Sequence, residues 1–216
     1  MSDIINTVIF DLDGTLLYTL DDLTDSTNFA INSFNYDSKT VDQIKSYVGN
    51  GVGLLIERAL PEGINNPHYK ECIELFKKHY AQNMYNKTKP YDGIPELLSS
   101  LKQNGFNIAV ISNKFDLAVK ELCNHYFKDQ IDIAIGQIDG KYIKPNPDGV
   151  MKIAELLNTT LDKCIMIGDS EVDIQTADNA NIPCISVTWG YKDIDFLYRN
   201  GATTLVYSPQ EILELI

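Results

Sequence analysis

Short apolar runs alternate with longer amphipathic segments from about residue 90 to the end of the sequence. Four of these runs, at residues 106–111, 131–135, 164–167 and 183–187, resemble buried strands, as does the run at residues 7–10. Segments with helical spacing, such as 96–101 and 150–157, lie between them. Because the runs are apolar along nearly their whole length, both faces of the sheet must be covered. The pattern predicts an α/β fold: a Rossmann-like parallel sheet with helices on both faces.

Residues 17–85 lack this strand pattern. Four helices are expected there, at residues 21–34, 41–47, 51–60 and 67–84. The turn sequences Gly49-Asn50-Gly51 and Pro61-Glu62-Gly63 separate the middle ones. A helical block that follows the first strand suggests an insertion. We therefore expect a small all-helical domain at residues 17–85, inserted into an α/β core made of residues 1–16 and 86–216.

The charge of the chain restricts its partners. Thirty Asp and Glu residues face eighteen Lys and Arg residues, which gives a formal net charge of -12. Such a surface repels nucleic acid and anionic membranes. The first residues do not resemble a secretory signal, no apolar run is long enough to span a bilayer, and the four cysteines form no C-x-x-C pair. We expect a cytoplasmic protein with free thiols, as a monomer or homodimer.

Asp11 and Asp13 come directly after the first predicted strand, in Asp11-Leu12-Asp13-Gly14-Thr15. In an open parallel sheet, ligands bind beyond the carboxyl ends of the strands. A carboxylate at that position can hold a metal and attack phosphorus, and Gly14 allows the chain to approach a phosphate closely. Two other interpretations fit these residues alone. One is an acidic turn that caps a helix, and the other is a calcium loop, although the later ligands of an EF-hand are missing.

Two further motifs carry polar side chains that could bind a phosphate. Ser112 and Asn113 end the next core strand, where they could bind a phosphoryl oxygen at the following helix N-terminus or simply cap that helix. Lys144 lies in Lys144-Pro145-Asn146-Pro147, where the prolines restrict the loop. It could present a fixed cation to a phosphate, or it could be an ordinary solvated lysine.

Asp169 and Asp173 follow the apolar strand at residues 164–167. Hard oxygen ligands of this kind suit Mg²⁺, but Ser170 to Asp173 also resembles a helix capping box. The combination of motifs favours chemistry, because the sheet places Asp11, Ser112 and Asp169 along one edge. A nucleophile, an acid/base, a cation and metal ligands at one edge are what phosphoryl transfer requires.

In this order, the four motifs resemble those of the haloacid dehalogenase superfamily of phosphohydrolases, across essentially the whole chain. The helical block resembles the small cap that this superfamily inserts between its first two motifs. Within the superfamily, Val48-Gly49-Asn50-Gly51 and Glu57-Arg58-Ala59-Leu60 resemble the cap of bacterial phosphoglycolate phosphatases, and Thr188-Trp189-Gly190-Tyr191 resembles their later loop.

The resemblance implies a role for each motif residue. Asp11 would be the nucleophile that becomes an aspartyl phosphate, and Asp13 the general acid and base. The Mg²⁺ cofactor would be held by Asp11, Asp169 and the Asp13 carbonyl, with Asp173 acting through water or Lys144. Ser112 and Lys144 would complete the catalytic set. The expected substrate-binding residues are Gly14, Thr15, Asn50, Arg58 and Asn113, although Arg58 could instead be a solvent-facing helix residue.

The implied function is a Mg²⁺-dependent phosphatase that acts on a small phosphorylated metabolite, with 2-phosphoglycolate as the leading substrate. Two enzymatic alternatives of the same build are an inorganic pyrophosphatase and a β-phosphoglucomutase-like sugar phosphomutase. The third alternative is a non-catalytic phosphate-binding protein, which predicts a damaged site. The three histidines show no metal-ligand spacing and are expected to pack or to lie on the surface.

Overall fold

The computed structural model describes residues 5–138 and 140–216, which form two compact units. The first unit contains the chain up to Leu17 together with Pro90–Ile216, and we call it the core unit. The second, which we call the helical unit, is Tyr18–Lys89. Within the described ranges, no helix has both the length and the apolar character needed to cross a bilayer.

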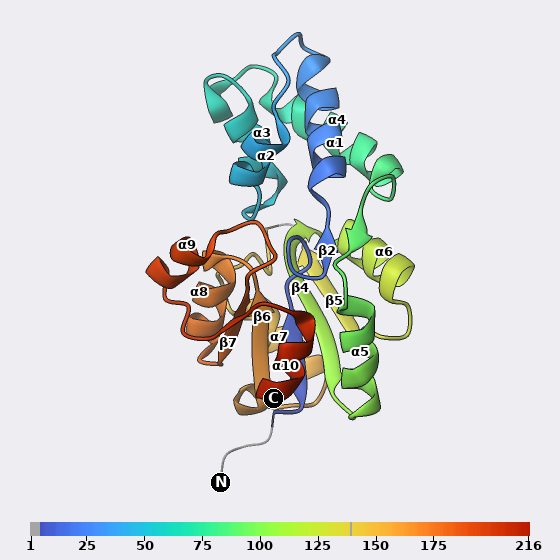
Figure 1. Ribbon diagram of the computed structural model, residues 1–216. Coiled ribbons are helices and arrows are strands. Elements are labelled where there is room, and N and C mark those ends of the chain that lie inside the picture. The colour runs from blue at the N-terminus through green and yellow to red at the C-terminus, as the bar shows by residue number, and fades with distance from the viewer. Residues whose placement is uncertain (1–4, 139) are drawn as a thin grey trace. The chain divides into compact units, whose positions relative to one another are not determined.

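The core unit contains a six-stranded sheet with the order β5-β4-β1-β6-β7-β8, and every neighbouring pair is parallel (Figure 1). All four residues of the central strand β1 are buried, because strands cover both of its edges and helices cover the sheet. This confirms the predicted fold class. The strands are β1 (Thr7–Phe10), β4 (Asn107–Phe115), β5 (Ile133–Gln137), β6 (Cys164–Gly168), β7 (Cys184–Val187) and β8 (Leu205–Val206).

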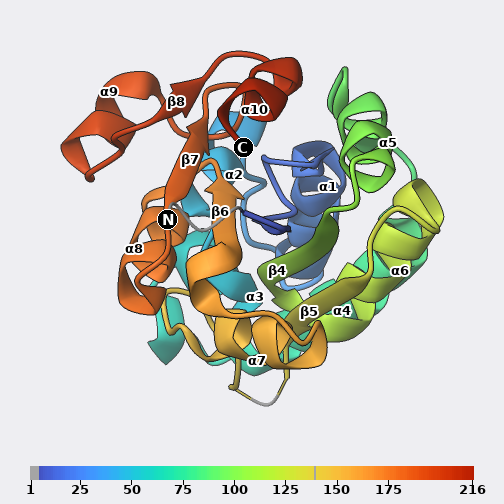
Figure 2. The ribbon, with the colours of Figure 1, turned by 90° about the horizontal axis from the view of Figure 1, so that it is seen from below.

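Helices cover both faces of this sheet. Figure 2 shows α5, α6 and α10 on one face and α7 and α8 on the other. The helices of the core unit are α5 (Ile94–Gln103), α6 (Asp116–Phe127), α7 (Asp148–Leu156), α8 (Glu171–Ala180), α9 (Ile194–Arg199) and α10 (Pro209–Leu215), with a 3-10 turn, η2 (Leu161–Lys163).

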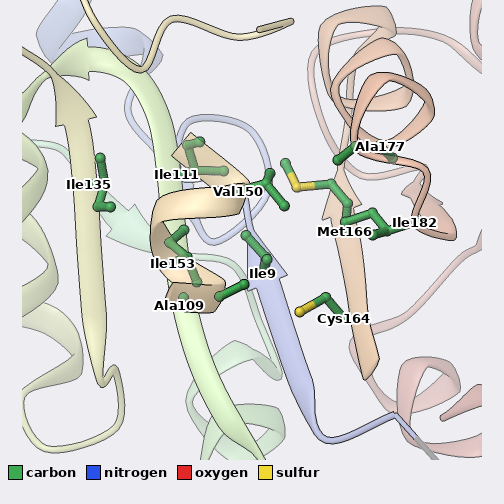
Figure 3. Packing of buried hydrophobic residues seen from close by; sticks show 12 residues of the cluster. Ile9, Ala109, Ile111, Ile135, Val150, Ile153, Cys164, Met166, Ala177 and Ile182 are labelled. Carbon is green, nitrogen blue, oxygen red and sulfur yellow. The ribbon is translucent and has the colours of Figure 1, made fainter. Parts of the chain in front are cut away.

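The packing between the sheet and α7 explains the apolar runs. Ile9 of β1, Ile111 of β4 and Met166 of β6 form one buried cluster with Val150 and Ile153 of α7 (Figure 3). Burying each such side chain contributes about 1.5–3 kcal/mol to folding. The same cluster fixes the three strands whose carboxyl ends carry the candidate site.

The helical unit contains α1 (Leu20–Asn32), α2 (Val41–Tyr47), α3 (Gly51–Ala59), η1 (Gly63–Asn65) and α4 (Tyr69–Asn83). Two of its histidines pack as expected: the His68 and His79 rings stack on Phe34 and Phe29, each with ring centroids 4.2 Å apart. Two short strands, β2 (Leu17–Tyr18) and β3 (Lys89–Pro90), pair with each other where the chain enters and leaves this unit.

Asp22 joins the two ends of the helical unit. Its buried carboxylate accepts hydrogen bonds from the backbone N–H groups of Lys87 and Thr88 at 2.9–3.1 Å, and from the Thr88 hydroxyl at 2.8 Å. The first turn of α1 is thereby fastened to the segment that leads back to the core unit.

All four cysteines are free thiols, as expected from their scattered positions. Cys72, Cys123 and Cys164 are buried, and burial raises the pKa of each thiol above its ordinary value. These side chains therefore act as small packing groups rather than as nucleophiles.

Candidate active site

The strand order creates a switch point beside β1. The chain continues from β1 to β4 and β5 on one side, and then returns to β6, β7 and β8 on the other. Asp11 follows β1 and Asp169 follows β6. The Asp11 backbone N–H donates to the Ile167 carbonyl at 2.9 Å, which ties the two loops together. Ligands of open α/β sheets bind at this kind of position.

Lys144 is buried between two carboxylates of this site. Its Nζ lies 2.8 Å from Oδ1 of Asp11 and 2.5 Å from Oδ1 of Asp173. The residue is 3% exposed, so the interpretation as a solvated loop lysine is wrong. Burial alone would lower the pKa of Lys144, but the two carboxylates raise it above its ordinary value. The ammonium group is therefore a permanent positive charge against Asp11.

Asp169 and Asp173 are both held by neighbouring donors. The Tyr191 backbone N–H donates to Oδ2 of Asp169 at 2.7 Å, and the Thr15 hydroxyl donates to Oδ1 at 3.2 Å. Asp173 accepts from the backbone N–H and the hydroxyl of Ser170 at 3.1 and 2.7 Å. The capping arrangement suspected at the start of α8 is therefore present, and Asp173 serves the cluster at the same time through Lys144.

Three carboxylates gather closely enough to share one cation. One oxygen from each of Asp11, Asp169 and Asp173 lies within 4.8 Å of the other two, and all three residues are buried. Burial, together with the neighbouring carboxylates, raises the pKa of Asp11 well above its usual range and that of Asp169 to about 7. Buried oxygen ligands with excess negative charge fit a hard divalent cation.

Glu171 adds a further acceptor to the same turn. Among the described residues, Oε2 of Glu171 is a buried side-chain oxygen without a hydrogen-bond partner. Glu171 is the first residue of α8 and follows Asp169 by two positions. An unsatisfied buried acceptor in this turn is consistent with a site built to receive a cation and its water.

Three glycines make room for these carboxylates. A Cβ at Gly190 would overlap the Cβ of Asp169, and a Cβ at Gly168 would overlap the carboxylate of Asp173. At Gly14 a Cβ would lie 2.5 Å from Oδ2 of Asp169, and the φ angle of +90° also favours glycine. The sequence pattern singled out Gly14, but it gave no role to Gly168 or Gly190.

Asp13 faces a second lysine. Its Oδ2 lies 3.2 Å from Nζ of Lys114, and both side chains are largely shielded from solvent. The tight loop that carries Asp13 is closed by backbone N–H groups of Leu16 and Leu17, which donate to the Leu12 carbonyl at 3.1 and 2.9 Å. No role was predicted for Lys114 from the sequence, because an ion pair between residues so distant in the chain leaves no local pattern.

Ser112 and Asn113 lie inside β4 rather than after it. The strand continues to Phe115, and Phe115 is the N-cap of α6, so the helix-capping interpretation of Ser112 and Asn113 is wrong. The Asn113 side chain pairs with the Lys144 backbone: it accepts from its N–H at 2.7 Å and donates to its carbonyl at 3.0 Å. Asn113 therefore holds the loop that presents Lys144, and its contact with a phosphoryl oxygen stays a prediction, as does that of Ser112.

The remaining predicted substrate contacts have structural partners of their own. Thr15 is buried; besides its bond to Asp169, its carbonyl accepts from the Trp189 indole N–H at 3.0 Å. In the helical unit, the exposed Arg58 donates to the Tyr47 carbonyl at 2.8 Å and to Oδ1 of Asn50 at 3.2 Å. The predicted roles of Thr15, Asn50 and Arg58 in substrate binding remain predictions.

Comparison with known proteins agrees with this geometry. Residues 8–187 match the family described as haloacid dehalogenase-like hydrolase. The chain is 36% identical to a phosphoglycolate phosphatase of Agrobacterium fabrum, over 86% of this chain and 82% of the relative. It is 34% identical to a phosphoglycolate phosphatase of Colwellia psychrerythraea, over 85% of this chain and 84% of the relative.

A solved structure is similar over nearly its whole length. A protein of Lactobacillus delbrueckii subsp. bulgaricus, described as a candidate phosphoglycolate phosphatase, superposes with a TM-score of 0.93 at 35% identity. The match covers 99% of this chain and 98% of that one. The match across residues 8–187 includes each of the motifs that form the carboxylate site. The chain belongs to the haloacid dehalogenase-like hydrolase family.

Proposed function

We propose that this protein is a divalent-metal-dependent phosphatase that hydrolyses a small phosphate monoester, with Mg²⁺ as the metal and 2-phosphoglycolate as the leading substrate. The observation that carries the proposal is the setting of Asp11. Its carboxylate lies beyond the central strand, 2.8 Å from Lys144 and in one cluster with Asp169 and Asp173. The relatives named phosphoglycolate phosphatase support the choice of substrate.

Asp11 and Asp13 would divide the reaction between them. An oxygen of Asp11 attacks phosphorus, the bond from phosphorus to the alcohol oxygen breaks, and Asp13 donates a proton to that oxygen. In the second step Asp13 takes a proton from water while the water oxygen attacks phosphorus. The bond between Asp11 and phosphorus then breaks, and phosphate leaves with Asp11 restored.

The other residues of the site would hold and neutralise charge. Lys144 opposes the effect of burial by lowering the pKa of Asp11, and it would offset the repulsion between a carboxylate and a phosphate dianion. Ser112 and the Asn113 backbone amide would hold the phosphoryl oxygens. Asp11, Asp169 and the Asp13 carbonyl would bind Mg²⁺, with Asp173 acting through water or Lys144. When bound, the metal supplies positive charge to the transferring phosphoryl group.

The test is phosphate release from a panel of phosphate esters with Mg²⁺, for the wild type, for Asp11→Asn and for the control Asp132→Asn. Asp132 also pairs with a lysine, Lys102 at 2.7 Å, but outside the site. We expect Asp11→Asn to lose at least about 10³-fold in kcat, whereas Asp132→Asn keeps nearly full activity. Turnover that survives in Asp11→Asn would show that another group is the nucleophile.

The same panel separates the alternative activities. Inorganic pyrophosphate and hexose phosphates are included beside 2-phosphoglycolate. Preferred release from pyrophosphate would indicate a pyrophosphatase, and conversion of a hexose phosphate to its isomer with little free phosphate would indicate a mutase. Binding of phosphate without turnover of any compound would indicate a non-catalytic protein and would refute the proposal.

A further inference from the structure

Lys114 is a nearly buried cation beside the proposed acid/base. Its Nζ is 3.2 Å from Oδ2 of Asp13, and the side chains of Lys114 and Asp13 are 5% and 13% exposed. The Lys114 backbone N–H also donates to the Ser112 hydroxyl oxygen at 3.3 Å. Lysine is almost never fully buried unless it is paired. The pair with Asp13 therefore holds an ammonium group beside the proposed acid/base, and this position suggests a specific purpose.

The charges of the site suggest that purpose. Its four aspartates, Asp11, Asp13, Asp169 and Asp173, are paired with or clustered around two lysines, Lys114 and Lys144. Lys144 already contacts both Asp11 and Asp173. A second anionic group on the substrate would therefore have to pair with Lys114, which lies next to Asp13.

The reach of Lys114 matches a particular kind of alcohol. Asp13 must come within about 2.6–3.2 Å of the ester oxygen to protonate it. When Oδ2 donates that proton, the Lys114 ammonium lies within roughly 6 Å of the ester oxygen. The oxygens of a carboxylate on the adjacent carbon are three bonds away from the ester oxygen, and each bond is about 1.2–1.5 Å long. The distance that remains suits one charge-assisted hydrogen bond of about 2.7–2.9 Å.

We propose that Lys114 selects the leaving group by binding a carboxylate on the carbon next to the ester oxygen. Asp13 then protonates the ester oxygen of the leaving alcohol, and Lys114 binds the carboxylate of the same alcohol. This inference rests on the proposed phosphatase function and adds to it a specificity residue. It predicts a preference for phosphate esters of 2-hydroxy acids over neutral esters of the same size.

The test compares two esters that differ in this one group: 2-phosphoglycolate and 2-hydroxyethyl phosphate. For the wild type we expect kcat/KM to be roughly 10- to 100-fold higher with phosphoglycolate. Lys114→Met should lose most of that factor on phosphoglycolate through KM, and change about threefold or less on the neutral ester. Lys114→Arg should keep part of the preference. The control is Lys120→Met, because Lys120 is exposed and pairs with Asp116 on α6.

The outcomes separate this inference from the function on which it rests. Equal use of both esters by the wild type would overturn the role of Lys114 even if no variant folds. Equal losses on both esters in a folded Lys114→Met protein would also overturn it, because Lys114 would then only position Asp13. No turnover of either ester would overturn the inference, whereas only the absence of turnover of every compound in the panel would refute the proposed function itself.

Discussion

Replacement of Lys144 by methionine tests the electrostatic design of the site most directly. The change removes the ammonium group and keeps a side chain of similar length. It leaves the Asp11 and Asp173 carboxylates buried, at positions that were 2.8 and 2.5 Å from Nζ. Removing one partner of a buried ion pair costs about 3–5 kcal/mol. Because two carboxylates lose their partner at once, we expect a loss of about 4–5 kcal/mol in the free energy of unfolding at pH 8.

The loss should depend on pH in a defined direction. The pKa of Asp11 is already raised by burial, with Lys144 opposing that effect. Without Lys144 it rises further. A carboxyl group whose pKa is raised by folding stabilises the folded protein at low pH, and this contribution disappears as the pH rises through the folded-state pKa. The deficit of Lys144→Met should therefore shrink as the pH falls from the Asp11 pKa of the variant to that of the wild type, by about 1.4 kcal/mol per pH unit for each proton taken up.

The measurement is denaturant unfolding at pH 5, 6.5 and 8 with a chelator present, so that bound metal does not contribute. Lys120→Met is the control, because Lys120 is 57% exposed and its pair with Asp116 should contribute less than about 1 kcal/mol. Adding Asp173→Asn to Lys144→Met should restore part of the stability at pH 8. A deficit below about 1 kcal/mol at pH 8, or one that grows as the pH falls, would refute the electrostatic reasoning.

Three other consequences can be measured. The pKa of Asp169 is raised to about 7. Below pH 7, each unit of increase in pH should therefore raise the affinity for Mg²⁺ about tenfold, and binding of Mg²⁺ should release a proton, which calorimetry in two buffers would detect. Gly190→Ala should weaken Mg²⁺ binding more than tenfold and destabilise the fold by about 1–3 kcal/mol, since its Cβ would overlap Asp169. The control Gly53→Ala, inside α3, should do neither. Equal Mg²⁺ binding by the two variants would contradict the argument that a side chain at residue 190 crowds Asp169. Asp22→Asn should lower stability by about 1–3 kcal/mol in thermal unfolding, because an amide places a donor against the N–H groups of residues 87 and 88; an unchanged melting temperature would show that these hydrogen bonds contribute nothing.

The parallel sheet could be predicted from the sequence because it depends on local apolar runs. Each predicted strand has a counterpart in the structure, and each of the four helices expected between residues 17 and 85 occurs with shifts of a few residues at its ends. β8 was missed because it has two residues, too few to form a pattern. β4 was expected to end at residue 111, because Ser112, Asn113 and Lys114 look like loop residues. They remain in the strand because each is buried with polar partners.

The site could be predicted only in part, for the same physical reason. Aspartates after apolar strands are visible in the sequence, because strand direction fixes where they lie. The partners that position them are not. Tyr191 donates to Asp169 from 22 residues further along the chain, and Lys114 pairs with Asp13 across a still longer separation. The crowding that requires glycine at positions 168 and 190 likewise exists only after the chain has folded.

The central position of β1 has a consequence for synthesis of the chain on the ribosome. Thr7 leaves the ribosome well before its register partners, Asn107 and Cys164. At about 5–20 residues per second, the first partner follows some 5–20 s later and the second later still. The helical unit is contiguous in sequence, so all of its residues leave the ribosome during that interval. Until those partners emerge, β1 is an apolar strand that has no neighbour, which is the kind of segment that a chaperone would be expected to protect.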